Sequence, residues 1–239
     1  MERQIKYKRV LLKISGESFG DKQGRGIDTE QFIVLASEIQ KISAWGVELA
    51  IVVGGGNILR GARLGKVGKS RIKADQAGMI ATAINGLLLQ DILEELNVKS
   101  HVMSAVEIKN FTEPFIIQNC LSYLKEKEVI IFTGGTGNPY FTTDTAGALR
   151  AIEISADVLL KATGVDGVYT DDPKKNASAK LHKKLSYIEV LTHRLGVMDM
   201  TAVSLSMENK LPIIVFNMNI RENIQKAIMG EQVGTYIGE

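Results

Sequence analysis

Short apolar segments alternate with longer amphipathic stretches along this chain. The short segments are rich in Val, Ile and Leu and lie at residues 10–14, 49–53, 101–104, 129–133, 158–161 and 213–217. Continuous apolar runs of this length are typical of parallel strands that are covered on both faces. The stretches between them carry apolar residues at three- and four-residue spacing, which predicts helices. The pattern therefore predicts an α/β fold, a three-layer αβα sandwich with a largely parallel central sheet.

Several predicted helices have recognisable starts. Suitable N-cap residues precede three of them: Asp28 or Thr29, Ser186 in a capping box with Glu189, and Asp199. A longer stretch, residues 75–96, is apolar nearly all round. A helix of that kind packs on a sheet or between subunits, and we expect both.

Length and charge narrow the class of protein. The 239 residues, 45% of them hydrophobic, contain no evident linker or repeat, which predicts a single domain, residues 1–239, with two lobes sharing one sheet. A net charge of +2 without a long basic run gives no support to nucleic-acid or membrane-surface binding. No apolar stretch reaches the ~20 residues that span a bilayer. Cys120 is the only cysteine, and Lys13 interrupts the first apolar run, so we expect no disulfide, no signal peptide and a cytoplasmic location.

Glycine-rich or small polar residues follow three of the predicted strands, at residues 13–16, 54–57 and 134–138. Ligands of open α/β sheets bind beyond the carboxyl ends of the strands. Glycine at such a position lets backbone N–H groups approach phosphate oxygens, although a single glycine is equally explained by a turn. Three such ends favour a phosphate-binding site.

Two familiar nucleotide motifs are absent from the sequence. Residues 68–70, Gly-Lys-Ser, resemble the end of a P-loop, but Arg63 replaces the required glycine and no strand precedes it. Residues 54–56 do not continue into a dinucleotide fingerprint, because Leu59 stands where its third glycine belongs.

Two lysines interrupt apolar strands near their carboxyl ends. Lys13 and Lys161 are suited to balance the charge of a transferring phosphoryl group. The alternative for Lys13 is an edge-strand lysine that extends to water. Arg60 follows the second glycine loop and can point to the same anion, or it can be a solvated helix residue.

Several acidic residues near these lysines and glycine loops are also candidate site residues. Asp75 is a candidate acceptor for a ribose hydroxyl, and Asp144 can hold a metal or orient the phosphoryl acceptor; helix capping is the alternative for both. In residues 163–173, Tyr169 can pack on a base and Asp171 or Asp172 can reach a ribose or Mg²⁺, unless the segment is an ordinary hairpin-like loop.

No nucleophile for covalent catalysis is evident. Cys120 lies in apolar surroundings and is interpreted as a buried structural thiol. The three histidines are scattered and show no metal-ligand spacing. We expect His182 and His193 to be solvated, whereas for His101 a core or interface role and a solvated one are equally supported.

Taken together, these motifs resemble the bacterial uridylate kinases, which have the amino-acid kinase (carbamate kinase-like) fold. The resemblance runs from Lys8 to Gly238 and rests on residues 13–17, 54–57, 60–61, 136–144, 161–163, 165–169, 172–173, 216–219 and 234–235. The lysine and glycine motifs are shared by the whole superfamily, whereas Gly-Asn-Pro-aromatic-Phe-Thr-Thr-Asp is specific to the uridylate branch.

The resemblance implies reversible in-line transfer of the ATP γ-phosphate to UMP, giving UDP and ADP for pyrimidine (CTP) biosynthesis. It implies catalytic roles for Lys13, Arg60, Asp144 and Lys161. It implies ATP contacts from Lys13, Ile14, Ser15, Gly16, Gly56, Arg60, Thr163, Tyr169 and Asp172. It implies UMP contacts from Gly55, Asp75, Thr136, Gly137, Asn138, Pro139, Tyr140, Phe141, Thr142 and Thr143. Mg²⁺ would be carried mainly by the ATP phosphates, so no protein ligand is assigned to it.

The family resemblance also implies a homohexamer that is inhibited by UTP and often activated by GTP. The loop associated with that activation corresponds to Asp21, Lys22, Gln23, Gly24, Arg25 and Gly26. Basic residues that contact GTP in some members correspond here to Gln90, His101 and Glu128. Because these positions are not strongly basic, the sequence does not predict GTP activation.

Two other functions fit parts of the sequence. One is a kinase of the same fold that acts on aspartate, acetylglutamate or a carbamate, which would not need residues 137–143. The other is a nucleotide-gated storage protein, similar to the molybdenum storage proteins, which should lose Lys13 and Lys161. Both features are present, and they favour UMP phosphorylation.

Overall fold

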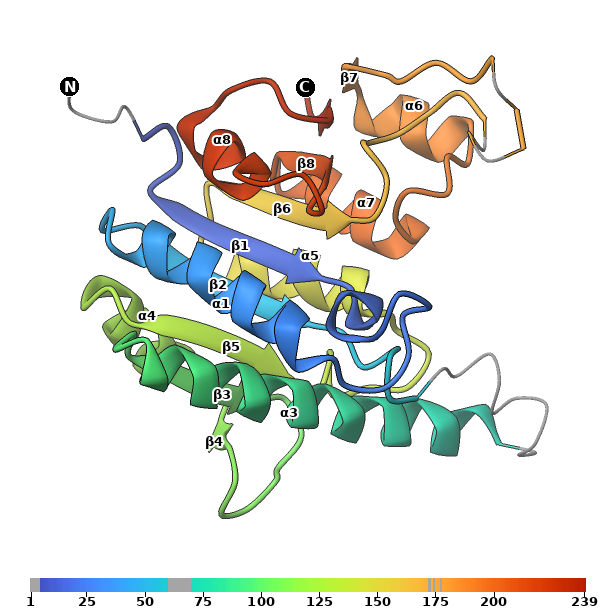
Figure 1. The fold of residues 1–239 in the computed structure, drawn as a ribbon. Coiled ribbons are helices and arrows are strands. Elements are labelled where there is room, and N and C mark those ends of the chain that lie inside the picture. The colour runs from blue at the N-terminus through green and yellow to red at the C-terminus, as the bar shows by residue number, and fades with distance from the viewer. Residues whose placement is uncertain (1–4, 60–69, 172, 174, 177) are drawn as a thin grey trace.

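The computed structural model describes residues 5–59, 70–171, 173, 175–176 and 178–239 (Figure 1). Its strands are β1 (Arg9–Ile14), β2 (Glu48–Val53), β3 (Ser100–Ser104), β4 (Glu113–Pro114), β5 (Val129–Thr133), β6 (Val158–Thr163), β7 (Lys184–Leu185), β8 (Ile213–Asn217) and β9 (Thr235–Ile237). They form one sheet in the order β4-β3-β5-β2-β1-β6-β8-β9-β7. Neighbouring strands are parallel except for β8 and β9, which are antiparallel.

Helices cover both faces of this sheet (Figure 1). Apolar residues of α1 (Thr29–Ser43), α3 (Arg71–Glu95) and α8 (Asn223–Met229) pack on one face. Those of α4 (Ile117–Lys125), α5 (Thr143–Glu153), α6 (Tyr187–Thr192) and α7 (Met200–Glu208) pack on the other. A short 3-10 helix, η1 (Gly16–Phe19), follows β1. The predicted αβα sandwich is therefore confirmed.

Side-chain alternation in β1 explains how one strand serves both the core and the site. Leu12 and Ile14 point into the core under α1, α3 and α8, whereas Leu11 points into the core under α5. Side chains alternate between the two faces of a strand, so Lys13 points to the same face as Leu11, the face that α5 covers. Its position in a central strand, between β2 and β6, shows that the edge-strand interpretation of Lys13 was wrong.

The six strands predicted from apolar runs are all present. Two, β5 and β8, have the predicted bounds, and the others extend one or two residues further. Asp28, Ser186 and Asp199 cap α1, α6 and α7, and Ser186 forms the predicted capping box with Glu189. The prediction for the long helix was less accurate, because α3 begins at Arg71 and Ser70 caps it by accepting a hydrogen bond from Lys73.

The helices in the described part of the chain include none that is long and apolar enough to cross a membrane. The longest of them, α3, buries Met79, Leu89 and Leu93 but exposes Ile72, Ile80 and Ile84.

Candidate functional site

The four central strands, β5, β2, β1 and β6, are parallel, so their carboxyl ends lie together at one end of the sheet. The loops after β1 and β2 pass each other backbone to backbone. A Cβ atom on Gly16 would lie 2.2 Å from the amide nitrogen of Gly56, and one on Gly54 would lie 2.5 Å from that of Gly16. Glycine is required at this crossing because any side chain would separate the two loops.

Lys13 and Lys161 are direct neighbours in this arrangement. They are in register on the parallel strands β1 and β6. The Nζ of Lys13 lies 2.7 Å from Oδ1 of Asp144, and the Nζ of Lys161 lies 2.5 Å from its Oδ2. Lys161 also donates a hydrogen bond to the carbonyl of Val197. All three charged side chains are at most 14% exposed, so the cluster is largely removed from water.

The electrostatics of this cluster favour an anion. Burial alone would raise the pKa of Asp144, but the ammonium groups of Lys13 and Lys161 hold it below its usual range. Burial lowers the pKa of Lys161, and the carboxylate of Asp144 partly offsets that effect. Two cations facing one carboxylate leave an excess positive charge that a phosphate group can neutralise.

The first turn of α5 fixes Asp144. Thr142 is the N-cap, and its hydroxyl accepts hydrogen bonds from the amides of Asp144, at 3.0 Å, and Thr145, at 3.3 Å. Asp144 is therefore not the cap, and the capping alternative for it was wrong. The amides of the first helical turn also bring positive polarity to this end of the cleft.

Asp199 connects this turn to α7, a role that the sequence analysis missed. Its carboxylate accepts hydrogen bonds from the hydroxyls of Thr142 and Thr145 while it caps α7 through the amide of Ala202. The sequence identified Asp199 only as a cap, because that signal is local and the contacts with α5 are not.

Gly147, one turn further along α5, is a second residue that the sequence analysis missed. A Cβ atom there would lie 3.4 Å from Cβ and Cγ of Lys13. A side chain larger than alanine would therefore displace the stem of Lys13. Gly147 lets α5 approach β1 closely enough for Asp144 to reach both lysines.

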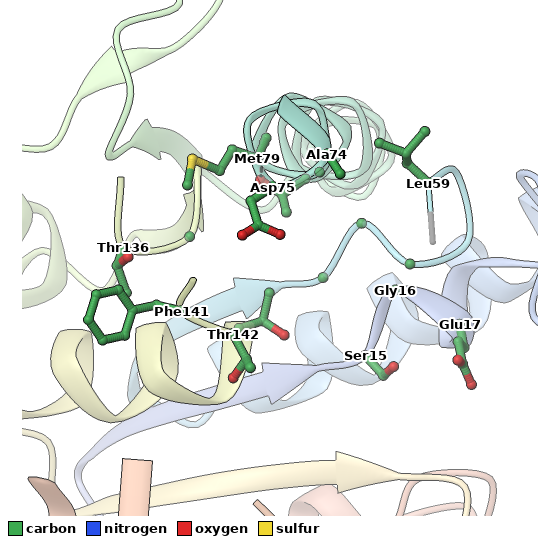
Figure 2. Close-up of a pocket in the computed structure, with 17 residues that line it drawn as sticks. Ser15, Gly16, Glu17, Leu59, Ala74, Asp75, Met79, Thr136, Phe141 and Thr142 are labelled. Carbon is green, nitrogen blue, oxygen red and sulfur yellow. Dashed lines mark hydrogen bonds between the residues drawn. The ribbon is translucent and has the colours of Figure 1, made fainter. Parts of the chain in front are cut away.

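A first cavity, of about 220 Å³, lies between α3 and the loop before α5 (Figure 2). It is lined by Ser15, Gly16, Glu17, Gly54, Gly55, Gly56, Leu59, Ala74, Asp75, Gly78, Met79, Thr82, Gly135, Thr136, Phe141, Thr142 and Thr143. Figure 2 shows the Asp75 carboxylate pointing from α3 into this space, with Thr142 and Phe141 across from it. We call it the acceptor pocket.

Asp75 is part of the body of α3 and joins the helix to the loop. Its Oδ2 accepts a hydrogen bond of 2.8 Å from the amide of Tyr140. Tyr140 has a left-handed backbone (φ 74°), and the guanidinium of Arg71 lies 4.8 Å from its ring centroid. Because the helix starts at Arg71, the capping alternative for Asp75 was wrong.

The predicted acceptor residues separate into two groups. Gly55, Asp75, Thr136, Phe141, Thr142 and Thr143 line the acceptor pocket. Gly137, Asn138, Pro139 and Tyr140 belong to the same loop but are not among the described lining residues. Asn138 closes the loop on itself, because its amide donates to the Thr136 hydroxyl at 3.2 Å.

A second cavity, of about 680 Å³, adjoins the first and shares Ser15 and Glu17 with it. It is lined by Lys13, Ser15, Glu17, Ser18, Gly20, Asp21, Lys22, Gln23, Gly24, Gln31, Lys161, Ala162, Thr163, Gly164, Met218 and Asn219. A third, of about 550 Å³, shares Lys161 and Thr163 with the second and includes Tyr169, Asp171 and Pro173. The two lysines therefore lie along a row of three adjoining cavities.

Of the other residues predicted to bind ATP, some line the second or third cavity and others do not. Thr163 closes a turn by donating to the carbonyl of Val165, and Tyr169 forms an isolated antiparallel bridge with Leu181 and lines the third cavity. The side chain of Ile14 is buried in the core, so only its backbone can face the cleft. Arg60 and Asp172 lie outside the described residues.

The loop that the sequence associates with activation lies beside the second cavity. The carboxylate of Asp21 accepts hydrogen bonds from the amides of Arg25 and Gln23, which hold its pKa below the usual value. Gly24 has a left-handed backbone (φ 69°), so the turn depends on glycine there. Asp21, Lys22, Gln23 and Gly24 all line the cavity.

His101 lies at the edge of the sheet, away from these cavities. Its two ring nitrogens each lie 2.7 Å from a carboxylate oxygen, one of Glu113 and one of Glu128, and its ring stacks on Tyr123. Burial by itself would lower the pKa of His101, but the two carboxylates raise it. His101 is thus partly buried with a hydrogen-bond partner at each ring nitrogen, and its immediate surroundings are acidic.

Cys120 is buried in α4, as expected of a structural thiol. Burial raises the pKa of its thiol to about 12, so the reactive thiolate is scarce at neutral pH.

Comparison with known proteins gives a consistent result. Residues 8–217 match the model of the amino acid kinase family. The solved UMP kinase of Bacillus anthracis is 39% identical with a TM-score of 0.94, over 97% of this chain and 96% of that one. The UMP kinase of Ureaplasma parvum is 36% identical with a TM-score of 0.92, over 98% and 100%. The uridylate kinase of Archaeoglobus fulgidus is 28% identical with a TM-score of 0.73, over 96% and 99%. The resemblance inferred from the motifs is confirmed.

Proposed function

The chain belongs to the amino acid kinase family, and we propose that it transfers the γ-phosphate of ATP reversibly to UMP, giving UDP and ADP. The observation that carries this proposal is the Lys13–Asp144–Lys161 cluster beside two adjoining cavities. In-line phosphoryl transfer needs the γ-phosphate of the donor and the phosphate of the acceptor to be aligned. It also needs positive charge around the phosphoryl group that is being transferred. The cluster provides that charge in a site with little access to water.

The reacting atoms and charges can be followed through the transfer. An oxygen of the UMP phosphate attacks the γ-phosphorus while the bond from that phosphorus to the bridging oxygen of ADP breaks. A phosphate monoester is largely dianionic at neutral pH, with a second pKa of about 6, so no general base is required. Lys13 and Lys161 balance the charge on the transferring oxygens, and Asp144 orients their ammonium groups.

We assign UMP to the acceptor pocket. Asp75 is aimed into it and can accept a hydrogen bond from a ribose hydroxyl, while its contact with the amide of Tyr140 keeps the carboxylate in place. Phe141 is 49% exposed at the pocket wall and offers a ring face for the uracil. Gly55, Gly56 and Thr143, at the start of α5, also line the pocket, and their backbone amides can donate to the UMP phosphate there.

We assign ATP to the second and third cavities, with its phosphates at Lys13 and Ser15 and its adenosine near Thr163 and Tyr169. Gly16, which lines the adjoining acceptor pocket, would contact the terminal phosphate where the two cavities meet. The chain would then work as two lobes, an acceptor-binding N-terminal part and an ATP-binding C-terminal part. Arg60 and Asp172, outside the described residues, keep their proposed catalytic and ATP-binding roles.

The residues present fit Mg²⁺ that arrives with ATP. Asp144, the buried carboxylate of the cluster, is already paired with two lysines, and the described residues contain no group of three or more His, Cys, Asp or Glu that could cage a metal. Mg²⁺ commonly binds through substrate phosphates with few protein ligands. When bound, it supplies charge neutralisation at the phosphates.

Regulation and assembly extend this proposal. UTP shares the uracil and ribose of UMP and would inhibit by competing for the acceptor pocket.

Ile72, Ile80 and Ile84, exposed on α3, support a subunit interface in a homohexamer. We propose no GTP activation through His101, because Glu113 and Glu128 would repel a triphosphate there. The enzyme would supply pyrimidine nucleotides in the cytoplasm.

A coupled assay of ADP release tests the assignment of the acceptor. UMP, CMP, dCMP, aspartate and acetylglutamate are supplied in turn with Mg-ATP. We expect turnover with UMP at least 100-fold above that with the other acceptors. Absence of turnover with UMP would overturn the proposal, and turnover with an amino acid would replace it with another kinase of the family.

A further inference from the structure

A fourth cavity, of about 340 Å³, lies where the segment before β1, the end of α8 and the strands β9 and β7 come together. In Figure 1 this is the region where the dark-blue start of the chain passes the red helix α8. It is lined by Lys6, Tyr7, Lys183, Lys184, Ile214, Gly230, Glu231, Gln232, Val233, Gly234 and Tyr236. It shares no lining residue with the three cavities of the cleft.

The wall of this cavity is part of the ordered sheet. Ile214, Tyr236 and Lys184 are cross-strand neighbours in register on β8, β9 and β7. Tyr7 is buried beside them, and its amide and that of Lys6 both donate to the carbonyl of Ile228 at the end of α8. The backbone that carries Lys6 and Lys184 is therefore hydrogen-bonded to α8 and to the sheet.

Within the part of the chain that the structure describes, the cations of this cavity form no ion pair, and two of them lie near tyrosine rings. The Nζ of Lys6 lies 5.1 Å from the ring centroid of Tyr7, and that of Lys184 lies 5.7 Å from the ring centroid of Tyr236. Across the described residues, none of Lys6, Lys183 and Lys184 forms an ion pair with a carboxylate. Among the described lining residues Glu231 is the only acidic side chain, so the side chains of these residues carry two net positive charges.

The loop that closes the cavity adds backbone donors. The amides of Gln232 and Val233 have no acceptor within the described part of the chain. Gly230 and Gly234, which bracket them, have left-handed backbones (φ 81° and 60°). Gln232 and Val233 line the cavity, so their amides are available as donors to a bound anion. The stem of Lys6 crosses Gly230 so closely that a Cβ there would lie 2.3 Å from its Cδ.

We propose that this pocket, the lysine–tyrosine pocket, binds a small phosphate-bearing anion of two to three negative charges, separately from the catalytic cleft. The lysines provide positive charge for it, and the amides of Gln232 and Val233, in the lining segment, are available as hydrogen-bond donors. The phenol rings give the pocket a partly apolar wall, which favours a phosphorylated organic molecule over a bare monovalent ion. The proposal does not depend on the identity of the acceptor in the cleft.

Equilibrium dialysis with labelled pyrophosphate tests this proposal, with the cleft saturated by UMP and a non-hydrolysable ATP analogue. We expect one remaining site per chain, which weakens as the salt concentration rises. The variant K6Q/K183Q/K184Q should bind at this site at least tenfold more weakly. The matched variant K109Q/K125Q/K210Q, which removes three exposed lysines elsewhere, should bind as the parent does.

Two outcomes would overturn the proposal. One is the absence of bound pyrophosphate once the cleft is saturated. The other is an equal loss in both triple variants, which would show a nonspecific effect of net charge. Circular dichroism melts of both variants verify folding, which exposed Lys→Gln changes should leave intact.

Discussion

Lys13 and Lys161 lie side by side in register on parallel strands, and their ammonium groups contact different oxygens of the same carboxylate. Neighbouring strands are about 4.8 Å apart, so two buried cations placed in this way repel each other unless an anion lies between them. Asp144 supplies that anion in the free protein. A bound phosphate group can then take the excess positive charge, which links the stability of the cluster to its chemistry.

Replacing Lys13 should affect transfer more than acceptor binding. Lys13→Ala is expected to lower kcat by about 100-fold or more, because a charge interaction that strengthens in the transition state is lost. The KM for UMP should change less than about threefold, since Lys13 does not line the acceptor pocket. Steady-state kinetics at saturating ATP measures both quantities. Lys41→Ala, on the exposed face of α1, is the control, and equal kcat values in the Lys13 variant and the parent would contradict the prediction.

Neutralising Asp144 should destabilise the fold in a pH-dependent way. Asp144→Asn leaves two buried ammonium groups together and is expected to cost about 3 kcal/mol at pH 7. The folded-state pKa of Asp144 is lowered, so its contribution is present above the unfolded pKa and is lost as pH falls through the folded value. Urea unfolding between pH 3 and pH 7 should therefore show the difference from the parent shrinking on acidification.

A second substitution separates charge from packing at this site. Asp144→Asn with Lys161→Met removes the repulsion and should recover part of the lost stability while remaining inactive. A stability difference that stays constant across the pH range would show that the carboxylate of Asp144 does not act as a charge.

Enlarging Gly147 should displace Lys13 without unfolding the protein. Gly147→Ala places a Cβ in contact with the Lys13 stem and should stabilise α5 slightly, with at most about a threefold loss in kcat. Gly147→Val adds methyl groups in the space of Lys13 and should lower kcat about tenfold. Thermal melts and kinetics of the two variants test this grading. Equal rates in the parent and the Val variant would show that Lys13 is not held by this contact.

The sequence predicted what depends on local patterns. Apolar runs identified the six long strands, because parallel strands buried on both faces are continuously hydrophobic. The strands β4, β7 and β9 were missed, since two or three residues are too short to show a period. The start of α3 was misplaced because the short polar side chain of Ser70 is a weaker signal than the apolar run after it.

The same limit applies to the candidate site. Lys13 and Lys161 were found because a lysine is conspicuous in an apolar strand. Asp199 and Gly147 were missed as site residues because their roles depend on contacts between distant segments; Asp199 and Thr142 are 57 positions apart. Asp144 was found as a candidate, but its pairing with both lysines follows only from the way α5 packs on β1.

Asp199 should matter through the threonines that it holds. Asp199→Ala is expected to lower kcat about tenfold, because Thr142 and Thr145 lose the acceptor that orients their hydroxyls at the start of α5. It should also cost about 1 kcal/mol in unfolding free energy through loss of the α7 cap. Asp199→Asn retains a capping oxygen, so it should recover stability more than activity. Recovery of full activity by Asn would show that capping alone explains the residue.

The His101 cluster should make stability depend on pH near neutrality. Glu113, Glu128 and Tyr123 face the imidazole, and Lys99 pairs with Glu128. The raised pKa of His101 means that its contribution is full below the unfolded value of about 6.5. That contribution is lost as pH rises through the folded value. His101→Gln should therefore be less stable than the parent at pH 6, by about 1 kcal/mol after solvent screening, and the gap should narrow by pH 9.

Urea unfolding at pH 6, 7, 8 and 9 measures this gap. His193→Gln, which removes an exposed imidazole, is the matched control and should shift stability little at any of these pH values. The pKa of Glu128 is lowered by its hydrogen bond with His101, so acidification below about pH 4.5 should also weaken the cluster in the parent. A gap between parent and His101→Gln that is independent of pH from 6 to 9 would mean that the imidazole is neutral there and stabilises the sheet edge by stacking on Tyr123 alone.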